Sequence, residues 1–267
     1  MTEPQLCIYK LGEGVIAFSS TRHGGFSKGH YANFNINHYC GDDETDIAKN
    51  RALLCEMLEI DESHLLMPHQ VHLTEIVTID NDFLSLSAEK QKARLEGVDA
   101  LMTNLKGVCI GVSTADCIPV LLYDQMKRVS CAIHAGWRGT VKRIVEKAVG
   151  EMGSVYGSHP EDIVAQIGPG IHLESFEVGD EVYETFVKEG FQMESISQRY
   201  PDSKGTGEEK WHIDLPECNR QQLLASGIPH NQINVSASDT FLQHETFFSA
   251  RRLGINSGRI FTGILMA

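Results

Sequence analysis

The sequence predicts an α+β or layered α/β protein rather than a doubly wound parallel sheet. Apolar strand-like runs and amphipathic helical runs follow one another without the strict alternation that a parallel βαβ sheet requires. Two of these runs, 120–123 and 129–133, flank a polar turn, which favours an antiparallel hairpin. At 267 residues the chain is long enough to bury a large core, and we expect one domain spanning 1–267.

Strands are expected wherever apolar and β-branched residues alternate or run together. These segments are 6–9, 15–19, 74–79, 100–103, 108–113, 120–123, 129–133, 163–167, 211–215, 233–236 and 259–265. Helical spacing of apolar residues predicts helices at 45–59, 140–152, 180–189 and 216–226, the second of them capped by Thr140. The charged stretch 81–96 is expected to be a solvated helix or long loop, and the polar stretch 194–210 a mobile insertion.

Composition narrows the class of protein. The chain is 42% hydrophobic and 22% charged, as in ordinary soluble proteins, and its formal net charge is −13. That charge argues against a nucleic acid or an anionic membrane as partner, because both require a basic face that releases counterions. We find neither a run of membrane-spanning length nor a secretion signal, so we expect a cytoplasmic protein, with a monomer as the starting assumption.

The seven cysteines do not indicate a disulfide framework. Their number is odd and no two form a C-x-x-C pair, so a structural zinc finger is not indicated either. We expect most of them to be reduced and buried, with Cys109 and Cys131 as thiols of the core.

Cys117 and His134 bracket the predicted hairpin, and both are of metal-ligating type. A turn centred between Gln125 and Met126 would pair them directly. Opposite residues on one face have Cβ atoms about 4.5–5.5 Å apart, which suits bonds of roughly 2.3 Å from sulfur and 2.0 Å from nitrogen to one Zn²⁺. On spacing alone, a buried thiol beside a hydrogen-bonded core histidine remains the alternative.

His69 and His72 are further candidates for ligands of the same metal. Their separation of three residues turns the two rings to opposite faces if the segment is extended. At most one of them is therefore expected to join Cys117 and His134, and the spacing does not choose between them.

Arg22 and Arg138 are candidates for holding an anion. Arg22 precedes His-Gly-Gly, a bend that can present the guanidinium group. Arg138 lies just before the helix predicted from Thr140, whose free N–H groups and positive dipole end could attract an anion beside His134. The alternatives are a surface arginine beside a turn and a surface neighbour of Trp137.

Several short motifs together resemble a known family. They are 21–25, 41–43 with Asn50 and Arg51, 70–72, 115–119, 134–139, 168–169, 177–179, 248–252 and 258–259. With them, nearly the whole chain resembles the YfiH or laccase-domain family, called polyphenol oxidase in older usage and purine nucleoside phosphorylase in newer usage. Many members have Cys-Thr where this chain has Ser238, Asp239 and Thr240, which puts any role of that cysteine in doubt here.

The resemblance implies metal ligands at His72, Cys117 and His134, and so selects His72 over His69. It implies a four-layer α/β/β/α sandwich with mixed sheets. Family members are described as splitting adenosine, inosine and methylthioadenosine with phosphate and as deaminating adenosine. We therefore expect an enzyme that uses Zn²⁺, or Cu²⁺, and takes purine nucleosides and phosphate, with substrate and phosphate held by Arg22, Gln70 and Arg138.

Three other functions stay open at this point. A copper oxidase would suit histidine and thiolate ligands, although a multicopper laccase needs repeated histidine pairs and only His69 and His72 form a close pair within a motif. A cysteine hydrolase would use Cys117 as nucleophile and His134 as base. A nucleotide-binding module would bind without turnover.

Overall fold

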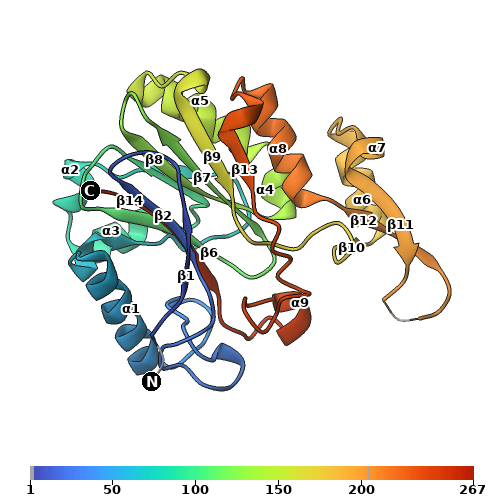
Figure 1. Cartoon of the computed structure of the whole chain (residues 1–267), viewed down its shortest axis with the longest axis horizontal. Coiled ribbons are helices and arrows are strands. Elements are labelled where there is room, and N and C mark those ends of the chain that lie inside the picture. The colour runs from blue at the N-terminus through green and yellow to red at the C-terminus, as the bar shows by residue number, and fades with distance from the viewer. Residues whose placement is uncertain (1–2, 204) are drawn as a thin grey trace.

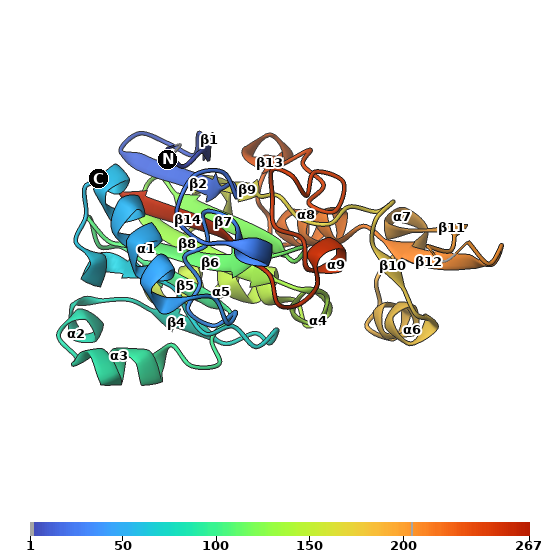
Figure 2. The same ribbon diagram turned by 90° about the horizontal axis from the view of Figure 1, so that it is seen from below.

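Two β-sheets packed face to face form the centre of the protein, and helices cover both outer faces (Figures 1 and 2). The structure is a computed structural model that describes residues 3–203 and 205–267. Both large sheets contain parallel and antiparallel neighbours. The predicted α+β class and the α/β/β/α sandwich with mixed sheets are therefore confirmed. No helix within the described ranges is long and apolar enough to span a membrane.

The strands of the two large sheets come from distant parts of the chain. The five-stranded sheet has the order β1 (Leu6–Tyr9), β2 (Val15–Ser20), β14 (Ile260–Met266), β6 (Cys109–Thr114), β3 (Leu65–Leu66). The six-stranded sheet has the order β13 (Ile233–Val235), β9 (Ile163–Ile167), β7 (Ile118–Asp124), β8 (Val129–Ala135), β5 (Ala100–Thr103), β4 (Ile76–Thr78). Every residue of β7 and β8 is buried, because both faces of these central strands are covered.

Three apolar layers hold the sandwich together. Helix α1 (Glu44–Leu58) packs Leu54 against Phe18 and Phe261 on the outer face of the five-stranded sheet. Ile110 and Leu121 belong to the layer between the two sheets. Helices α5 (Ile144–Tyr156) and α8 (Leu215–Ala225) cover the outer face of the six-stranded sheet. The shorter helices are α2 (Asn81–Leu84), α3 (Ala88–Arg94), α4 (Trp137–Val141) and α9 (Ala250–Leu253).

A small third sheet stands beside the sandwich, at the right of Figure 1. Its order is β10 (Glu177–Val178), β12 (Glu209–Ile213), β11 (Ser197–Pro201), with α6 (Asp180–Lys188) and α7 (Met193–Ile196) next to it. The stretch 194–210, expected to be a mobile insertion, forms α7, β11 and the start of β12 in its described residues, and residue 204 lies outside them. Trp211 stabilises the sheet by stacking on Tyr183, with ring centroids 3.9 Å apart, while Arg199 lies over the same indole.

The β7–β8 hairpin differs in register from the predicted one by two residues. A four-residue turn follows Asp124, whose buried carboxylate accepts hydrogen bonds from two N–H groups of the turn at 2.9 and 2.8 Å. His134 consequently pairs with Pro119, and Cys117 lies just before β7. The prediction that Cys117 and His134 are directly opposite is wrong. Because a shift of two residues leaves each side chain on its original face, the two can still meet.

The helix expected at 140–152 is divided into two. Helix α4 begins at Trp137 and ends at Val141, and α5 begins at Ile144 after Arg143 adopts a left-handed φ of 62°. Thr140 lies within α4 and is not an N-cap. The predicted N-terminus of a long helix beside His134 is therefore absent. The helix that follows β8 is α4, which has only five residues.

Candidate metal centre

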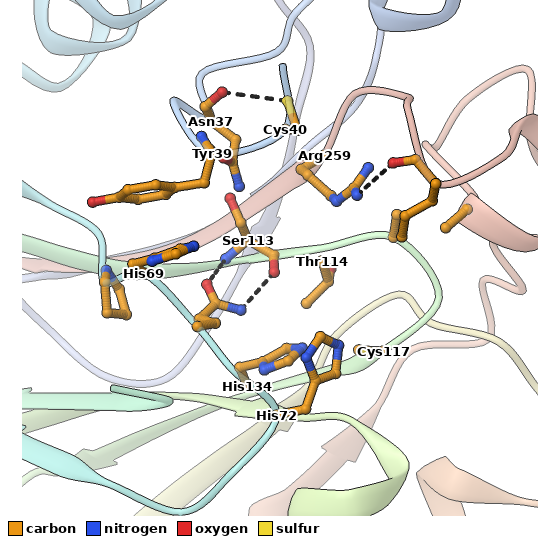
Figure 3. A pocket seen from close by; sticks show the side chains of 15 residues that line it. Asn37, Tyr39, Cys40, His69, His72, Ser113, Thr114, Cys117, His134 and Arg259 are labelled. Carbon is orange, nitrogen blue, oxygen red and sulfur yellow. Dashed lines mark hydrogen bonds between the residues drawn. The ribbon is translucent and has the colours of Figure 1, made fainter. Parts of the chain in front are cut away.

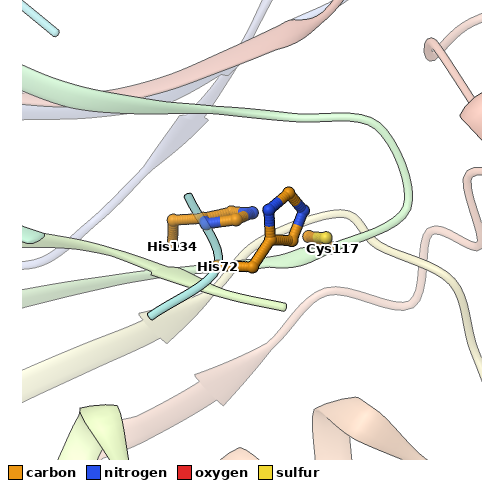
Figure 4. Close-up of side chains that lie close together, drawn as sticks. All are labelled: His72, Cys117 and His134. Atoms are coloured by element: carbon orange, nitrogen blue, oxygen red, sulfur yellow. The ribbon is translucent and has the colours of Figure 1, made fainter. Parts of the chain in front are cut away.

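The structure brings together the three predicted ligands, His72, Cys117 and His134 (Figure 4). Their potential ligand atoms all lie within 4.8 Å of one another, and no other such group of three occurs in the described part of the chain. The two imidazole rings meet edge to face with centroids 4.7 Å apart. His134 is buried, Cys117 partly buried and His72 exposed, so one side of the cluster is open to a ligand.

Asp99, immediately before β5, supports the cluster from behind. Its fully buried carboxylate accepts a hydrogen bond from Nδ1 of His134 at 2.8 Å. It also accepts hydrogen bonds from the backbone N–H groups of His72 at 3.0 Å and Leu73 at 2.7 Å. One side chain thus orients the His134 ring, leaving Nε2 for a metal, and fixes the turn in which His72 has a left-handed φ of 63°.

Gly136 leaves room for the three ligands to converge. A Cβ atom at this position would lie 2.9 Å from Cδ2 of His72 and 3.1 Å from Sγ of Cys117. Its φ is −66°, which any residue can adopt, so the need for glycine comes from space and not from the backbone. No side chain larger than hydrogen fits between the ligands as they stand.

The charges of Cys117 and His134 are coupled. Burial alone raises the pKa of the Cys117 thiol, but the facing His134 and His72 outweigh it and lower the pKa to about 6. Burial lowers the pKa of His134, and the facing Cys117 thiolate together with Asp99 raises it to about 9. Each group therefore stabilises the charged form of the other: His134 favours the Cys117 thiolate, and the thiolate together with Asp99 favours the protonated His134 ring.

These donors fit a four-coordinate metal ion. Two imidazole nitrogens and one thiolate are ligands that Zn²⁺ takes, and three protein ligands with one open position are typical of catalytic sites. Bonds of 2.0–2.3 Å in a tetrahedron separate ligand atoms by roughly 3.3–3.8 Å, so small side-chain rotations would close the set. Cys117, poised as a thiolate, and His134, oriented by Asp99, meet the remaining requirements for ligation.

The cluster lies at the wall of a cavity of about 310 Å³ (Figure 3). Gln70 lines it, but both ends of its amide bond the backbone of Ser113, at 2.8 Å to the carbonyl and 2.7 Å from the N–H. The predicted substrate-binding residue thus holds the cavity wall. Thr114, only 1% exposed, also lines the cavity, and its buried hydroxyl has no hydrogen-bond partner among the described residues.

His69 also lines the cavity but is not part of the metal cluster. Its ring stacks on Tyr39, with centroids 4.2 Å apart, and its Nδ1 lies 2.6 Å from Oε1 of Glu96. The prediction that His69 and His72 turn to opposite faces is wrong, since both line this cavity. The segment is irregular rather than extended, and His72 has a left-handed φ, so only His72 joins the cluster.

The two predicted anion-binding arginines lie elsewhere. Arg22 donates from Nε to the carbonyl of Ala32 at 2.9 Å and from Nη1 to that of His244 at 2.6 Å, and it does not line the cavity. Arg138 is exposed and lies over the ring of Trp137, outside the cavity lining. Among the described residues, Arg259 is the only arginine or lysine that lines the cavity, and it was not one of the predicted anion-binding residues.

Asp99, Gly136 and Arg259 are the residues that sequence reasoning missed. An aspartate directly before a buried strand is the only signal that pointed to Asp99. Gly136 and Arg259 lay inside recognised motifs without an assigned role. The altered segment 238–240 also has a structural part, since the hydroxyl of Thr240 donates at 2.8 Å to the carboxylate of Asp116, the neighbour of Cys117.

Comparison with known proteins identifies the family to which the chain belongs. Residues 16–267 match the family model described as multi-copper polyphenol oxidoreductase laccase. The chain belongs to this laccase family. A purine nucleoside phosphorylase of Bacteroides thetaiotaomicron is 48% identical over 249 residues, 93% of this chain and 90% of that protein. A protein of an unknown prokaryotic organism named adenosine deaminase RL5 is 46% identical over 255 residues, 96% and 95% of the two chains.

Solved structures of the laccase family share the fold. The Bacillus licheniformis hypothetical protein YfiH superposes with a TM-score of 0.89 at 27% identity, covering 99% of this chain and 97% of that one. YlmD from Geobacillus stearothermophilus gives 0.85 at 32% identity, covering 95% and 92%. The resemblance to YfiH proteins drawn from the motifs is confirmed, and the relatives' names point to an enzyme acting on purines.

Proposed function

We propose that this protein is a zinc-dependent purine nucleoside enzyme. It splits adenosine and inosine with phosphate to the free base and ribose 1-phosphate, treats methylthioadenosine in the same way, and deaminates adenosine to inosine. The observation that carries the proposal is the cluster of His72, Cys117 and His134 at the wall of a cavity of about 310 Å³, a size suited to a small molecule. The names of the two relatives quoted above support the substrate class.

The chain's own residues prepare the site for this chemistry. A Zn²⁺ ion held by His72, Cys117 and His134 would supply Lewis-acid activation at its open position. Asp99 keeps the proton of His134 on Nδ1, so that Nε2 offers its lone pair to the cluster. Thr114 adds a buried hydroxyl without a hydrogen-bond partner among the described residues of the cavity wall.

Arg259 is our candidate for the phosphate that phosphorolysis consumes. Several backbone carbonyls of the 255–258 segment hold its guanidinium group, among them that of Ile255 at 2.9 Å, and its Nε has no partner within the described ranges. A fixed guanidinium at the cavity wall is suited to a phosphate anion. The roles predicted for Arg22 and Arg138 remain predictions, as does the cytoplasmic location.

A second candidate function follows from one specific observation. Without a metal ion, Cys117, His134 and Asp99 form a thiolate–imidazolium–carboxylate series, the arrangement of a cysteine hydrolase. Loss of activity on chelation, with recovery on adding Zn²⁺, separates the two functions. Laccase-type copper chemistry calls for several metal sites, whereas the described residues offer one three-ligand cluster.

The deciding experiment measures products and metal together. Protein of known zinc content is incubated with adenosine, inosine or methylthioadenosine, with and without phosphate, and the products are separated by chromatography. We expect free base only when phosphate is present, and inosine from adenosine in either case. Cys117→Ala is the matched inactive control, expected to fold but to lose metal and both reactions. Turnover by the zinc-free variant would refute the proposal.

A further inference from the structure

A second cavity, of about 500 Å³, lies where the small third sheet approaches α9. Its lining comes from three places: β12 and its neighbouring loops, the segment around Ser175, and α9 with Phe241. It shares no lining residue with the cavity of the metal cluster. Helix α9 separates the two, since Ala250 lines the first cavity whereas Arg251 and Arg252 line the second.

Two arginines of this cavity have no acidic partner. Neither Arg251 nor Arg252 forms an ion pair with any described residue, although the chain carries a formal net charge of −13. Arg252 lies over the ring of Phe241 and its guanidinium group makes no hydrogen bond in the described structure. Arg251 lies over Phe176 and uses only Nη1, which donates to the carbonyl of Glu177 at 3.1 Å. Most of their planar N–H donors are free, which suits a phosphate group.

His212 adds a buried polar atom to the same cavity. The residue is 5% exposed, its Nδ1 lies 3.1 Å from the carbonyl of Leu173, and its Nε2 has no partner among the described residues. A buried polar atom without a partner costs free energy unless a ligand or water satisfies it. A hydroxyl group can do so by donating to Nε2.

Carboxylates and apolar surface complete the lining. Glu174 and Glu177 lie on the wall, and the latter accepts the N–H of Ser203 with one oxygen only. Carboxylate oxygens accept hydrogen bonds from hydroxyl groups but repel a bare phosphate. Pro201 and the ring of Phe241 offer apolar contact. The lining therefore matches a molecule that has a phosphate at one end and several hydroxyls at the other.

We propose that this cavity binds a phosphorylated sugar. The phosphate lies on the guanidinium groups of Arg251 and Arg252, and the sugar hydroxyls bond His212 and the two glutamates. The site is separate from the metal cluster and does not depend on the function proposed for it.

Titration calorimetry of the full chain tests the site, with ribose 5-phosphate as the probe and ribose and inorganic phosphate as comparisons. We expect ribose 5-phosphate to bind in this cavity more tightly than inorganic phosphate, and ribose not to bind. Arg252→Gln removes the guanidinium group that makes no hydrogen bond within the described structure, and should weaken ribose 5-phosphate binding about tenfold or more. Arg252→Lys keeps the positive charge but loses the planar guanidinium group, so its affinity for ribose 5-phosphate should lie between those of Arg252→Gln and the unaltered protein.

Two controls make the result specific. Arg199→Gln alters another arginine that lies over an aromatic ring in the small sheet but is not part of the cavity, so affinity should stay unchanged. His72→Ala alters the other cavity and should also leave ribose 5-phosphate binding unchanged. Equal affinity of Arg252→Gln and the unaltered protein, equal affinity for ribose 5-phosphate and inorganic phosphate, or loss of binding in His72→Ala would each overturn the proposal.

Discussion

The carboxylate of Asp99 lies 2.8 Å from Nδ1 of His134, and the same carboxylate holds the backbone of His72. One buried acid therefore positions two of the three ligands. Asp99→Asn keeps the shape but weakens the orientation of the ring, so we expect zinc affinity to fall about 10–100-fold. Competition with a chelating dye measures this. Asp124→Asn is the matched control, because that buried carboxylate also caps a turn but lies at the far end of the hairpin. Equal losses of zinc affinity in both variants would contradict a specific role.

Gly136→Ala tests whether space between the ligands matters. The added methyl group would lie 2.9 Å from the His72 ring and must displace it, so we expect weaker zinc binding in a protein that still folds. Gly150→Ala, in α5, meets no atom within 4 Å and should leave zinc binding intact while stabilising the fold by about 0.5–1 kcal/mol. Zinc titration and thermal unfolding of both variants decide; unchanged zinc affinity in Gly136→Ala would show that the cluster tolerates the methyl group.

Zinc titration of two variants distinguishes the predicted ligand His72 from its neighbour His69. His72→Ala removes a ring of the cluster and should abolish tight binding. His69→Ala removes a ring that contacts Tyr39 and Glu96, so it should cost at most the 10–100-fold associated with supporting contacts. If His69→Ala abolished binding and His72→Ala did not, the assignment of the ligands would be wrong.

Removing the metal should make Cys117 the most reactive thiol at mildly acidic pH. Its pKa is lowered to about 6, because His134 and His72 outweigh the effect of burial. The reactive thiolate therefore dominates above about pH 6, and below it the rate should fall about tenfold per pH unit. Burial raises the pKa of Cys109 and Cys131, which should stay unmodified. Iodoacetamide labelling read by mass spectrometry gives the profile; added Zn²⁺ should protect Cys117, and a midpoint near pH 9 would refute the prediction.

The phosphate site is tested by comparing two reactions of one variant. Arg259→Gln should raise the phosphate concentration needed for phosphorolysis about tenfold or more, because a charged hydrogen bond is lost. Deamination of adenosine consumes no phosphate and should change little. Arg22→Gln and Arg138→Gln test the residues predicted from the sequence alone. Parallel losses of both reactions in Arg259→Gln would indicate a structural role instead.

Most of the fold could be predicted because local patterns and packing agree. The strands 100–103 and 163–167 have the predicted bounds, and the helix expected at 45–59 differs from α1 by one residue at each end. The insertion at 194–210 could not be predicted, because β11 and β12 are short and polar and depend on the stacking of Trp211 on Tyr183, a contact between distant positions. Polar composition alone suggested mobility.

The site was predictable in its ligands but not in its supports. The motifs supplied Cys117 and His134, yet the register depended on turn bonds made by Asp124, which no simple count of residues reveals. The hydrogen bond from the His72 backbone to Asp99 depends on a left-handed φ at His72, and a histidine in the sequence does not predict that conformation. Arg22 was a candidate for binding an anion because the sequence does not reveal its hydrogen-bond partners. These are the backbone carbonyls of Ala32 and His244, which meet the guanidinium group only in the folded chain.

Helix α9 lies between the two cavities and is hydrogen-bonded to the segment that carries Cys117. The backbone N–H of Arg251 donates at 2.7 Å to the carboxylate of Asp116, the residue next to Cys117. This hydrogen bond is a direct contact between α9 and the segment that carries the thiol. Thermodynamic reciprocity then applies: if an occupant of the arginine cavity changes zinc affinity by some factor, zinc must change the affinity for that occupant by the same factor. The unchanged ribose 5-phosphate affinity expected of His72→Ala therefore carries a second meaning: filling the arginine cavity should leave zinc affinity unchanged, although one turn of helix divides the two cavities.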